Sequence, residues 1–351
     1  MKRMKTRNLM IMMAAAALTM ASCHTKEQSK PVTLSGAGAT FPQPYYTMVF
    51  KAYHEQTGNV VSYGGIGSGG GINSLKEGVV DFAGSDAYLS DEEMKEMKPV
   101  VHIPTCMGAV VIAFNLNGIQ DLNLTGEVVA KIYSGEIKYW DDAQIKALNE
   151  NVTLPHKQVT PVYRSDGSGT TFVFTDYLCK VSPAWSEKYG RGKSVSFPAG
   201  IAAKGNPGIA GVLSQTDGSI GYVGSEYAFA QQLNFAALQN ACGEFVKPST
   251  ASISAAAQTE VPADTRCMIT NSNAPGAYPI SLFTWIIAYK DLNNGKRTAA
   301  EADSLKAMFE FILSDEMQAL TEKIHYAPLP AKVKMQSLKN IREMSYVSEN
   351  K

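Results

Sequence analysis

Residues 164–171 combine an arginine, an aspartate, glycines and several hydroxyl side chains in one short run that precedes apolar residues. This pattern predicts a strand that passes through a glycine-rich turn into a helix. Because a helix start carries free backbone N–H groups and the positive end of the helix dipole, an oxyanion can bind there. Ser168, Thr170 and Thr171 would add hydroxyl donors, and Arg164 a planar cation with two parallel donors. The segment therefore predicts a site for a tetrahedral oxyanion.

Two further glycine-rich turns precede predicted helices, at residues 36–44 and 65–71. In the first, Pro42 suits an opening helical turn because its missing N–H would have no partner there, which leaves Thr40 and the Phe41 amide facing the turn. The second lacks the Gly-x4-Gly-Lys-Ser/Thr pattern of phosphate-binding loops, so nucleotide hydrolysis is disfavoured. Either turn alone could be an ordinary tight connection. Together with residues 164–171, they point to one anion chemistry.

An aspartate follows the predicted strand at residues 81–84, and Asp86 can be interpreted in two ways. It could simply cap the next turn at the surface. Alternatively, its carboxylate could accept a hydrogen bond from an anion that still carries a proton, as phosphate does and sulfate does not. A site built around one hydroxyl can reject an analogue that lacks it by roughly 10⁴–10⁵. Asp166 could orient Arg164 by an ion pair and could also accept from the ligand.

Charge is balanced over the 351 residues, with 32 Lys and Arg against 32 Asp and Glu. The first 22 residues contain basic side chains and no acidic ones, so the rest of the chain is mildly acidic. This balance argues against nucleic-acid binding. An anion site in this chain must therefore depend on local geometry.

The N-terminus has the pattern of a targeting segment. A basic start precedes an uncharged, mostly apolar run at residues 9–22, which is short for a membrane span and typical of a signal-peptide core. The run ends at Cys23 in a pattern that resembles a bacterial lipobox, in which the cysteine is lipidated and the preceding signal (residues 1–22) is removed. A plain secretory signal with an incidental cysteine is the alternative. Residues 23–30 are expected to be a flexible tether.

Four cysteines and five histidines follow or flank this segment without metal-site spacing. In an oxidising compartment Cys242 and Cys267 are the favoured disulfide pair, although free thiols are equally compatible with the sequence. The other two cysteines are Cys106 and Cys179. No metal or other cofactor is expected.

Short strands and helices alternate along the chain, which predicts a parallel α/β architecture. Apolar runs at residues 100–104 and 109–115, and again at 281–289, could carry the chain from one lobe to another and back. Strands are also expected at 32–34, 59–63, 81–84 and 219–223. Helices are expected at 42–58, 72–77, after Ser90, 128–133, 143–148 and 170–178, and mainly from 298 onward.

The order of four motifs resembles the phosphate-binding proteins of bacterial high-affinity phosphate ABC transporters. The motifs are Gly-Ala-Gly-Ala-Thr-Phe-Pro at 36–42, Gly-Ile-Gly-Ser-x-Gly-Gly at 65–71, Asp-Phe-x-x-Ser-Asp-Ala at 81–87 and Arg-x-Asp-Gly-Ser-Gly-Thr at 164–170. The resemblance runs from about residue 34 to 330. Residues 240–273 do not follow the family pattern, and Gly69 replaces a second serine.

By this resemblance the fold is α/β, a type II-like two-lobed periplasmic binding protein whose doubly wound lobes are joined by two crossover strands. Lobe 1 would comprise residues 31–106 and 281–351, and lobe 2 residues 107–280. The implied phosphate-binding residues are Thr40, Phe41 (by its amide), Ser68 and Asp86 in lobe 1, and Arg164, Asp166, Ser168, Gly169 and Thr170 in lobe 2.

The expected function is capture of inorganic phosphate outside the cytoplasm and its delivery to the permease subunits of an ABC transporter. The protein is expected to be a monomer in the periplasm or at the cell surface, to be anchored through Cys23 and to catalyse no reaction. An extracytoplasmic phosphatase is one alternative, which the lack of a paired nucleophile and base weakens. A binding protein for another oxyanion is the other.

Overall fold

The computed structural model describes residues 31–293 and 297–347. The expected signal peptide (1–22), the lipidation site Cys23 and the whole tether (23–30) lie outside the described residues.

Most strands of the described chain belong to one mixed sheet. The strands are β1 (Thr33–Gly38), β2 (Val60–Gly65), β3 (Phe82–Ser85), β4 (Val100–Asn115), β5 (Asn123–Leu124), β6 (Thr160–Arg164), β7 (Ile201–Ala203), β8 (Ser219–Gly224), β9 (Asn234–Phe235), β10 (Ala237–Gln239), β11 (Phe245–Val246) and β12 (Ser281–Tyr289). The main sheet has the order β2-β1-β3-β12-β4-β8-β6-β7, and β9 also pairs with β4. A small separate sheet has the order β11-β10-β5.

Helices connect and cover these strands. They are α2 (Gln43–Thr57), α3 (Ser68–Lys76), α4 (Asp91–Lys95), α5 (Gly126–Tyr133), α6 (Ala143–Ala147), α7 (Gly169–Val181), α8 (Pro183–Lys188), α9 (Gly205–Gln215), α10 (Ser225–Ala230), α11 (Thr250–Ala256), α12 (Ala299–Ile312), α13 (Asp315–Leu320), the 3₁₀ helix η1 (Thr321–Ile324) and α14 (Ala331–Arg342).

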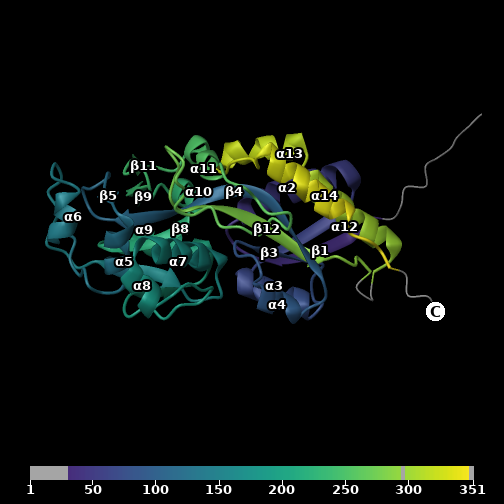
Figure 1. Cartoon of the computed structure of the whole chain (residues 1–351), viewed down its shortest axis with the longest axis horizontal. Coiled ribbons are helices and arrows are strands. Elements are labelled where there is room, and N and C mark those ends of the chain that lie inside the picture. The colour runs from purple at the N-terminus through teal and green to yellow at the C-terminus, as the bar shows by residue number, and fades with distance from the viewer. Residues whose placement is uncertain (1–30, 294–296, 348–351) are drawn as a thin grey trace, which may run out of the picture. The chain divides into compact units, whose positions relative to one another are not determined.

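Two sets of parallel strands make up the ends of the main sheet. In the first group, β1 pairs in parallel with β2 and β3. In the second group, β6 pairs in parallel with β7 and β8. Strands β4 and β12 run antiparallel to each other between the two groups (Figure 1). The sheet is therefore parallel within each group and antiparallel where the two groups join.

The predicted crossing segments are present, in altered form. The apolar runs at 100–104 and 109–115 belong to one continuous strand, β4, which pairs with β12 up to Ala109 and with β8 from Val110. Residues 281–289 form β12, as expected. A single strand replaces the two predicted runs because β4 changes partner along its length without leaving the extended conformation.

Helix α2 shows how the sequence specifies an element locally. Its buried aromatic and aliphatic side chains recur at helical spacing, Pro44 lies in its first turn, and Gly58 ends it in the left-handed conformation at φ 76°. The predicted helix at 42–58 is confirmed. The helix expected after Ser90 is also present as α4, and it begins with a capping box in which Ser90 and Glu93 bond reciprocally.

Helix α3 begins earlier than predicted. The run at 65–71 is not a loop throughout, because the helix already starts at Ser68 and includes three glycines. Glycine is a poor helix former, so the sequence alone favours a loop here. Tertiary packing decides otherwise: a Cβ at Gly71 would collide with the backbone of Ala37 and Gly38, so glycine lets this helix lie directly against β1.

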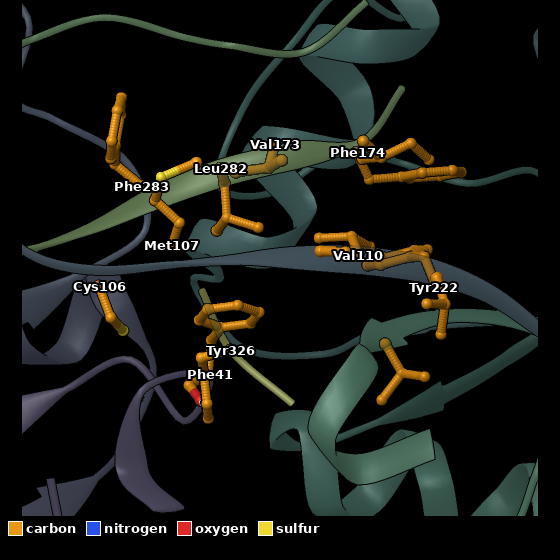
Figure 2. Close-up of a cluster of buried hydrophobic side chains, with 14 of the residues drawn as sticks. Phe41, Cys106, Met107, Val110, Val173, Phe174, Tyr222, Leu282, Phe283 and Tyr326 are labelled. Atoms are coloured by element: carbon orange, nitrogen blue, oxygen red, sulfur yellow. The ribbon is translucent and has the colours of Figure 1, made fainter. Parts of the chain in front are cut away.

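One buried core continues across the junction of the two groups. Figure 2 shows Met107 and Val110 of β4 beside Leu282 and Phe283 of β12, with Phe41 and Tyr326 near the first group and Phe174 and Tyr222 near the second. The Phe174 and Tyr222 rings stack with centroids 4.3 Å apart. The strands between the groups are thus fixed by apolar packing.

The favoured disulfide is not formed. Cys242 and Cys267 are free thiols, as are Cys106 and Cys179. Cys242 is exposed after β10, where its Sγ lies 3.4 Å from the Asn273 carbonyl oxygen, whereas Cys267 is partly buried. Proximity in the sequence does not bring these two side chains into bonding geometry.

Candidate functional site

The predicted site residues follow the carboxyl ends of parallel strands in both groups. Thr40 follows β1, Ser68 follows β2 and Asp86 follows β3. Arg164 ends β6, and Ser168 and Thr170 come directly after it. In parallel α/β sheets this edge is where ligands bind, because the loops and helix starts of several strands meet there.

Asp86 lies at the centre of the cluster and is buried. Its Oδ1 accepts a hydrogen bond from the Thr284 hydroxyl at 2.8 Å, and its Oδ2 accepts one from Thr170 at 3.3 Å. Burial raises the pKa of Asp86 to about 7, although the hydrogen bond from Thr284, the charge of Arg164 and the hydrogen bond from Thr170 act to lower it. This carboxyl group therefore titrates near neutral pH and not in the usual acidic range.

Arg164 is held in one orientation by Asp166. Its Nε and Nη2 donate to the two carboxylate oxygens at 2.7 Å and 2.5 Å, and the arginine side chain is only 1% exposed. Burial raises the pKa of Asp166, but the hydrogen bonds and charge of Arg164 outweigh it and bring the pKa below its ordinary value. Arg164 Nη1 faces the Thr170 hydroxyl at 3.4 Å. The fork of the guanidinium is thus fixed with its free edge toward the cluster.

Ser68 connects the first group to the start of α7. Its Oγ accepts hydrogen bonds from the backbone N–H of Gly169 at 3.1 Å and of Asp86 at 3.3 Å. Nearby, the Gly69 N–H donates to the Gly167 carbonyl at 2.8 Å. These contacts bring the glycine-rich turns of the two groups together.

Thr40 meets the second group at Asn206. Its Oγ1 accepts hydrogen bonds from the Asn206 backbone N–H at 3.0 Å and from Nδ2 at 3.1 Å. Asn206 Nδ2 also lies 3.3 Å from the Thr170 hydroxyl. Residues predicted from all four motifs are therefore joined in one buried network.

The remaining predicted residues have more local contacts. Ser168 caps α7 by accepting from the Thr171 N–H at 3.0 Å. The Thr171 hydroxyl is bonded to the Tyr222 hydroxyl at 2.8 Å, which directs it to the core. Phe41 packs its ring edge-on against Tyr326, whose hydroxyl donates to the Phe41 carbonyl at 2.5 Å (Figure 2). This packing fixes the backbone beside Thr40.

Sequence reasoning missed two residues that contact this network, Asn206 and Thr284. Asn206 follows β7 as Ser168 follows β6, and its Gly-Asn-Pro-Gly run is itself a helix start, so this signal could have been used. Thr284 lies inside the apolar strand β12, where a threonine is indistinguishable from an ordinary β-branched core residue.

A second buried carboxyl group, that of Glu226, lies in the first turn of α10. Neither of its oxygens has a hydrogen-bond partner among the described residues. Burial raises its pKa well above the ordinary value, and the nearby charge of Asp86 adds to the rise. A Cβ at Gly224 would collide with this carboxyl group, so the close fit depends on glycine. Burial thus favours the protonated, neutral form of the Glu226 carboxyl group.

A metal site and a membrane-spanning helix would each place requirements on the described residues. No three His, Cys, Asp or Glu side chains there are grouped so that they could hold a metal ion. None of the helices there has the length and apolar character needed to cross a bilayer.

Residues 25–316 match the PBP superfamily domain. The chain is 40% identical over 309 residues to the phosphate-binding protein PstS of Xylella fastidiosa, covering 87% of this chain and 83% of that protein. It is 33% identical over 346 residues to the phosphate-binding protein PstS of Methanocaldococcus jannaschii, covering 90% and 88% of the two chains.

Solved structures share the fold at lower identity. A high-affinity periplasmic phosphate-binding protein (PfluDING), solved with bound phosphate, superposes with a TM-score of 0.69 at 23% identity, covering 87% of this chain and 92% of that one. An ABC-type phosphate transport receptor from Vibrio cholerae gives a TM-score of 0.55 at 19% identity, covering 85% and 100%. The fold is thus that of two-lobed periplasmic binding proteins, as the sequence predicted.

Proposed function

This chain belongs to the PBP superfamily and, within it, to the PstS phosphate-binding proteins, and we propose that it captures inorganic phosphate and delivers it to an ABC transporter permease. The observation that carries the proposal is the meeting of Thr40, Ser68 and Asp86 from the first group with Arg164 and Thr170 from the second. Such a network supplies hydrogen-bond donors from two sides of one anion. Capture and release then follow from the approach and separation of two lobes.

The proposed lobes extend the two strand groups. Residues 31–106 and 281–351 would form lobe 1, and residues 107–280 lobe 2, with β4 and β12 as the crossovers. The contacts between Ser68 and Gly169 and between Thr40 and Asn206 then cross the interface between lobes. A ligand that bonds to both sides favours the closed arrangement because only that arrangement completes its shell of donors.

Each predicted residue receives a role in phosphate binding. From lobe 1, the Thr40 hydroxyl, the Phe41 amide and Ser68 would donate, while Asp86 would accept a hydrogen bond from the O–H group that phosphate carries. From lobe 2, Arg164, Ser168, Thr170 and the amide of Gly169 would donate. Asp166 would hold the guanidinium in place through its two hydrogen bonds.

Calorimetric titration of the signal-free protein tests this function. One equivalent of phosphate should bind, arsenate should compete because it also carries a proton, and sulfate should bind far more weakly. Equal affinity for sulfate and phosphate would contradict the role of Asp86. No heat of binding and no competition by any of the three anions would overturn the proposal.

Capture without chemistry is part of the proposal. The carboxyl groups of the described cluster are paired: Asp86 accepts hydrogen bonds from Thr284 and Thr170, and Asp166 accepts from Arg164, which is an arrangement that suits anion binding. Incubation with a chromogenic phosphate ester should release no product. Turnover that survives repurification, and that disappears in an Arg164→Ala variant, would instead establish a phosphatase.

The cellular setting is proposed from the N-terminal sequence. Cleavage before Cys23 and lipidation of its thiol would leave a monomer tethered outside the cytoplasm, where it could meet the permease. Mass spectrometry of the mature protein should find a diacylglycerol-modified Cys23, and Cys23→Ala should release the protein from membranes. An unmodified N-terminus at another residue would favour the plain secretory signal.

A further inference from the structure

The side chain of Asn206 joins a threonine of the first group to a threonine of the second. It lies at the start of α9, after β7, and is fully buried. Its Nδ2 is 3.1 Å from Thr40 Oγ1 and 3.3 Å from Thr170 Oγ1. One amide group therefore contacts a hydroxyl from each group of strands.

The orientation of this amide is fixed by a third contact. Asn206 Oδ1 accepts a hydrogen bond from the Gly224 N–H at 3.0 Å. A flipped amide would place Nδ2 against that N–H, donor against donor, so the network determines which end of the side chain faces the threonines. The N–H end of Asn206 is directed at Thr40 and Thr170.

This orientation decides what the Thr40 hydroxyl can do. A hydroxyl has one proton to donate and two lone pairs to accept with. Both Asn206 N–H groups donate to Thr40 Oγ1, one from the backbone at 3.0 Å and one from the side chain at 3.1 Å. Because its lone pairs are occupied, Thr40 has only its proton left, and it can act only as a donor.

Thr170 is constrained in the same way. Its Oγ1 faces two donors, Asn206 Nδ2 at 3.3 Å and Arg164 Nη1 at 3.4 Å. Its proton points to Asp86 Oδ2 at 3.3 Å. The hydroxyl is therefore a donor aimed at an acidic oxygen, a position in which an anion oxygen can compete with the carboxylate.

We propose that Asn206 is a positioning residue for anion capture. It fixes the Thr170 hydroxyl of its own group as a donor, and it fixes the Thr40 hydroxyl as a donor only when the two groups of strands are in contact. The inference rests on the proposed function. A fully deprotonated or singly protonated oxyanion presents mainly hydrogen-bond acceptors. Hydroxyls that already point their protons into the site need not be oriented when the anion binds, so the free-energy cost of binding is lower. Through Asn206, contact between the two groups of strands determines that the Thr40 hydroxyl faces the site as a hydrogen-bond donor.

Two variants and a control test this role by phosphate titration. Asn206→Asp replaces a donor by an acceptor, so Thr40 and Thr170 would turn their protons toward it, and affinity should fall by about a hundredfold. Asn206→Ala leaves the hydroxyls free to rotate and should cost about tenfold. Gln215→Ala, an exposed change at the other end of α9, should leave affinity unchanged.

A double-mutant cycle separates positioning from mere support of the fold. If Asn206 acts through Thr40, then Asn206→Ala should cost markedly less in a Thr40→Ala background than in the wild-type chain. A purely structural role would give the full cost in both backgrounds and a lower melting temperature without ligand. The cycle uses only alanine variants, so it decides the question even if Asn206→Asp does not fold.

The outcomes distinguish this inference from the function on which it rests. Wild-type protein that does not bind phosphate would overturn both. Wild-type binding together with near-wild-type affinity in Asn206→Asp and Asn206→Ala would overturn the positioning role and leave phosphate capture intact.

Discussion

Burial and hydrogen bonding have opposite effects on the pKa of the Asp86 carboxyl group. Burial dominates and raises the pKa to about 7, so a proton is available on this side chain near neutral pH. Phosphate carries an O–H group of its own, and the ionised carboxylate can accept a hydrogen bond from it. Sulfate has none, and it can bind without an unpaired contact only if Asp86 itself is protonated.

Selectivity should therefore depend on pH. Above the Asp86 pKa, sulfate binding requires uptake of a proton, so the ratio of phosphate to sulfate affinity should rise by about tenfold per pH unit. Below it, the ratio should level off. Competition titrations across this range measure the ratio directly.

The matched variant is Asp86→Asn, which keeps the shape and adds a permanent N–H donor. Its affinity ratio should be low and nearly independent of pH, with sulfate gaining more than phosphate loses. A wild-type ratio that does not change with pH would remove Asp86 from the selectivity mechanism.

Burial of Glu226 should make the folded protein less stable as the pH rises. Its folded-state pKa is raised by burial, so the protonated form is the one that the folded state favours. The stability that this preference contributes is complete below the ordinary carboxyl pKa and is lost as the pH rises through the raised one. The raised pKa of Asp86 has the same effect: its contribution to folding stability is also lost as the pH rises, over a range that ends near pH 7.

Replacement of Glu226 by Gln should remove this dependence without changing the side-chain volume. In thermal unfolding, wild-type protein should lose stability as the pH rises above the ordinary carboxyl pKa, and Glu226→Gln should lose distinctly less over the same range. Parallel curves for the two proteins would show that Glu226 is ionised, or solvated, in the folded state.

Most of the site could be predicted at the level of residues because its members follow glycine-rich turns. Thr40, Ser68, Asp86, Arg164 and Thr170 meet as predicted. Their function as phosphate ligands stays a prediction. Asn206 was missed although its Gly-Asn-Pro-Gly run marks a helix start. Thr284 could not be predicted, because its role depends on strand neighbours that only the folded sheet defines.

At the scale of elements, helix α3 illustrates packing that overrides propensity. Its glycines are unfavourable for a helix in isolation, yet they allow α3 to contact β1 along the backbone. Sequence periodicity cannot report such an approach, since glycine has no side chain to pattern. The predicted start of this helix at 72 was late for that reason.

Two alanine substitutions in α3 should have opposite effects. Gly71→Ala places a Cβ against the backbone of Ala37 and Gly38, which cannot move away cheaply, and should destabilise the protein by about 1–3 kcal/mol. Gly70→Ala meets only the flexible Ile66 side chain, at 3.1 Å, and should be neutral or stabilising by about 0.5–1 kcal/mol. Urea unfolding measures both values. Equal effects would mean that helix propensity, not close approach, explains these glycines.

Across the whole molecule, the alternation of strands and helices predicted the α/β class, and the apolar runs predicted the crossovers. Strand direction did not follow from the same evidence. Strands β4 and β12 pair antiparallel, and an apolar run carries no signal for the direction of its partner. The antiparallel junction is what places the carboxyl ends of the two parallel groups on opposite sides of one site.

Contacts between the two groups also include one ion pair outside the predicted site. Lys193 pairs with Glu93 of α4, while the Lys193 carbonyl accepts the N–H of Ser168 at 2.8 Å. Glu93 uses its other oxygen to cap α4 through the Ser90 N–H at 2.8 Å. The pair therefore connects the start of α7 to a rigid helix end in the opposite group, and it should stabilise the closed arrangement.

Loss of this pair should speed the release of phosphate more than it slows capture, because the pair forms only after the two groups approach. Lys193→Met and Glu93→Gln should each raise the dissociation rate by about two- to fivefold, the range expected for a partly exposed ion pair. Glu93→Gln retains an oxygen to cap α4, so its effect reports the lost charge. In stopped-flow measurements the double variant should release phosphate no faster than either single variant, and added salt should narrow the difference from wild type. Additive effects in the double variant, or changes confined to the association rate, would show that Lys193 and Glu93 act separately and do not hold the lobes closed.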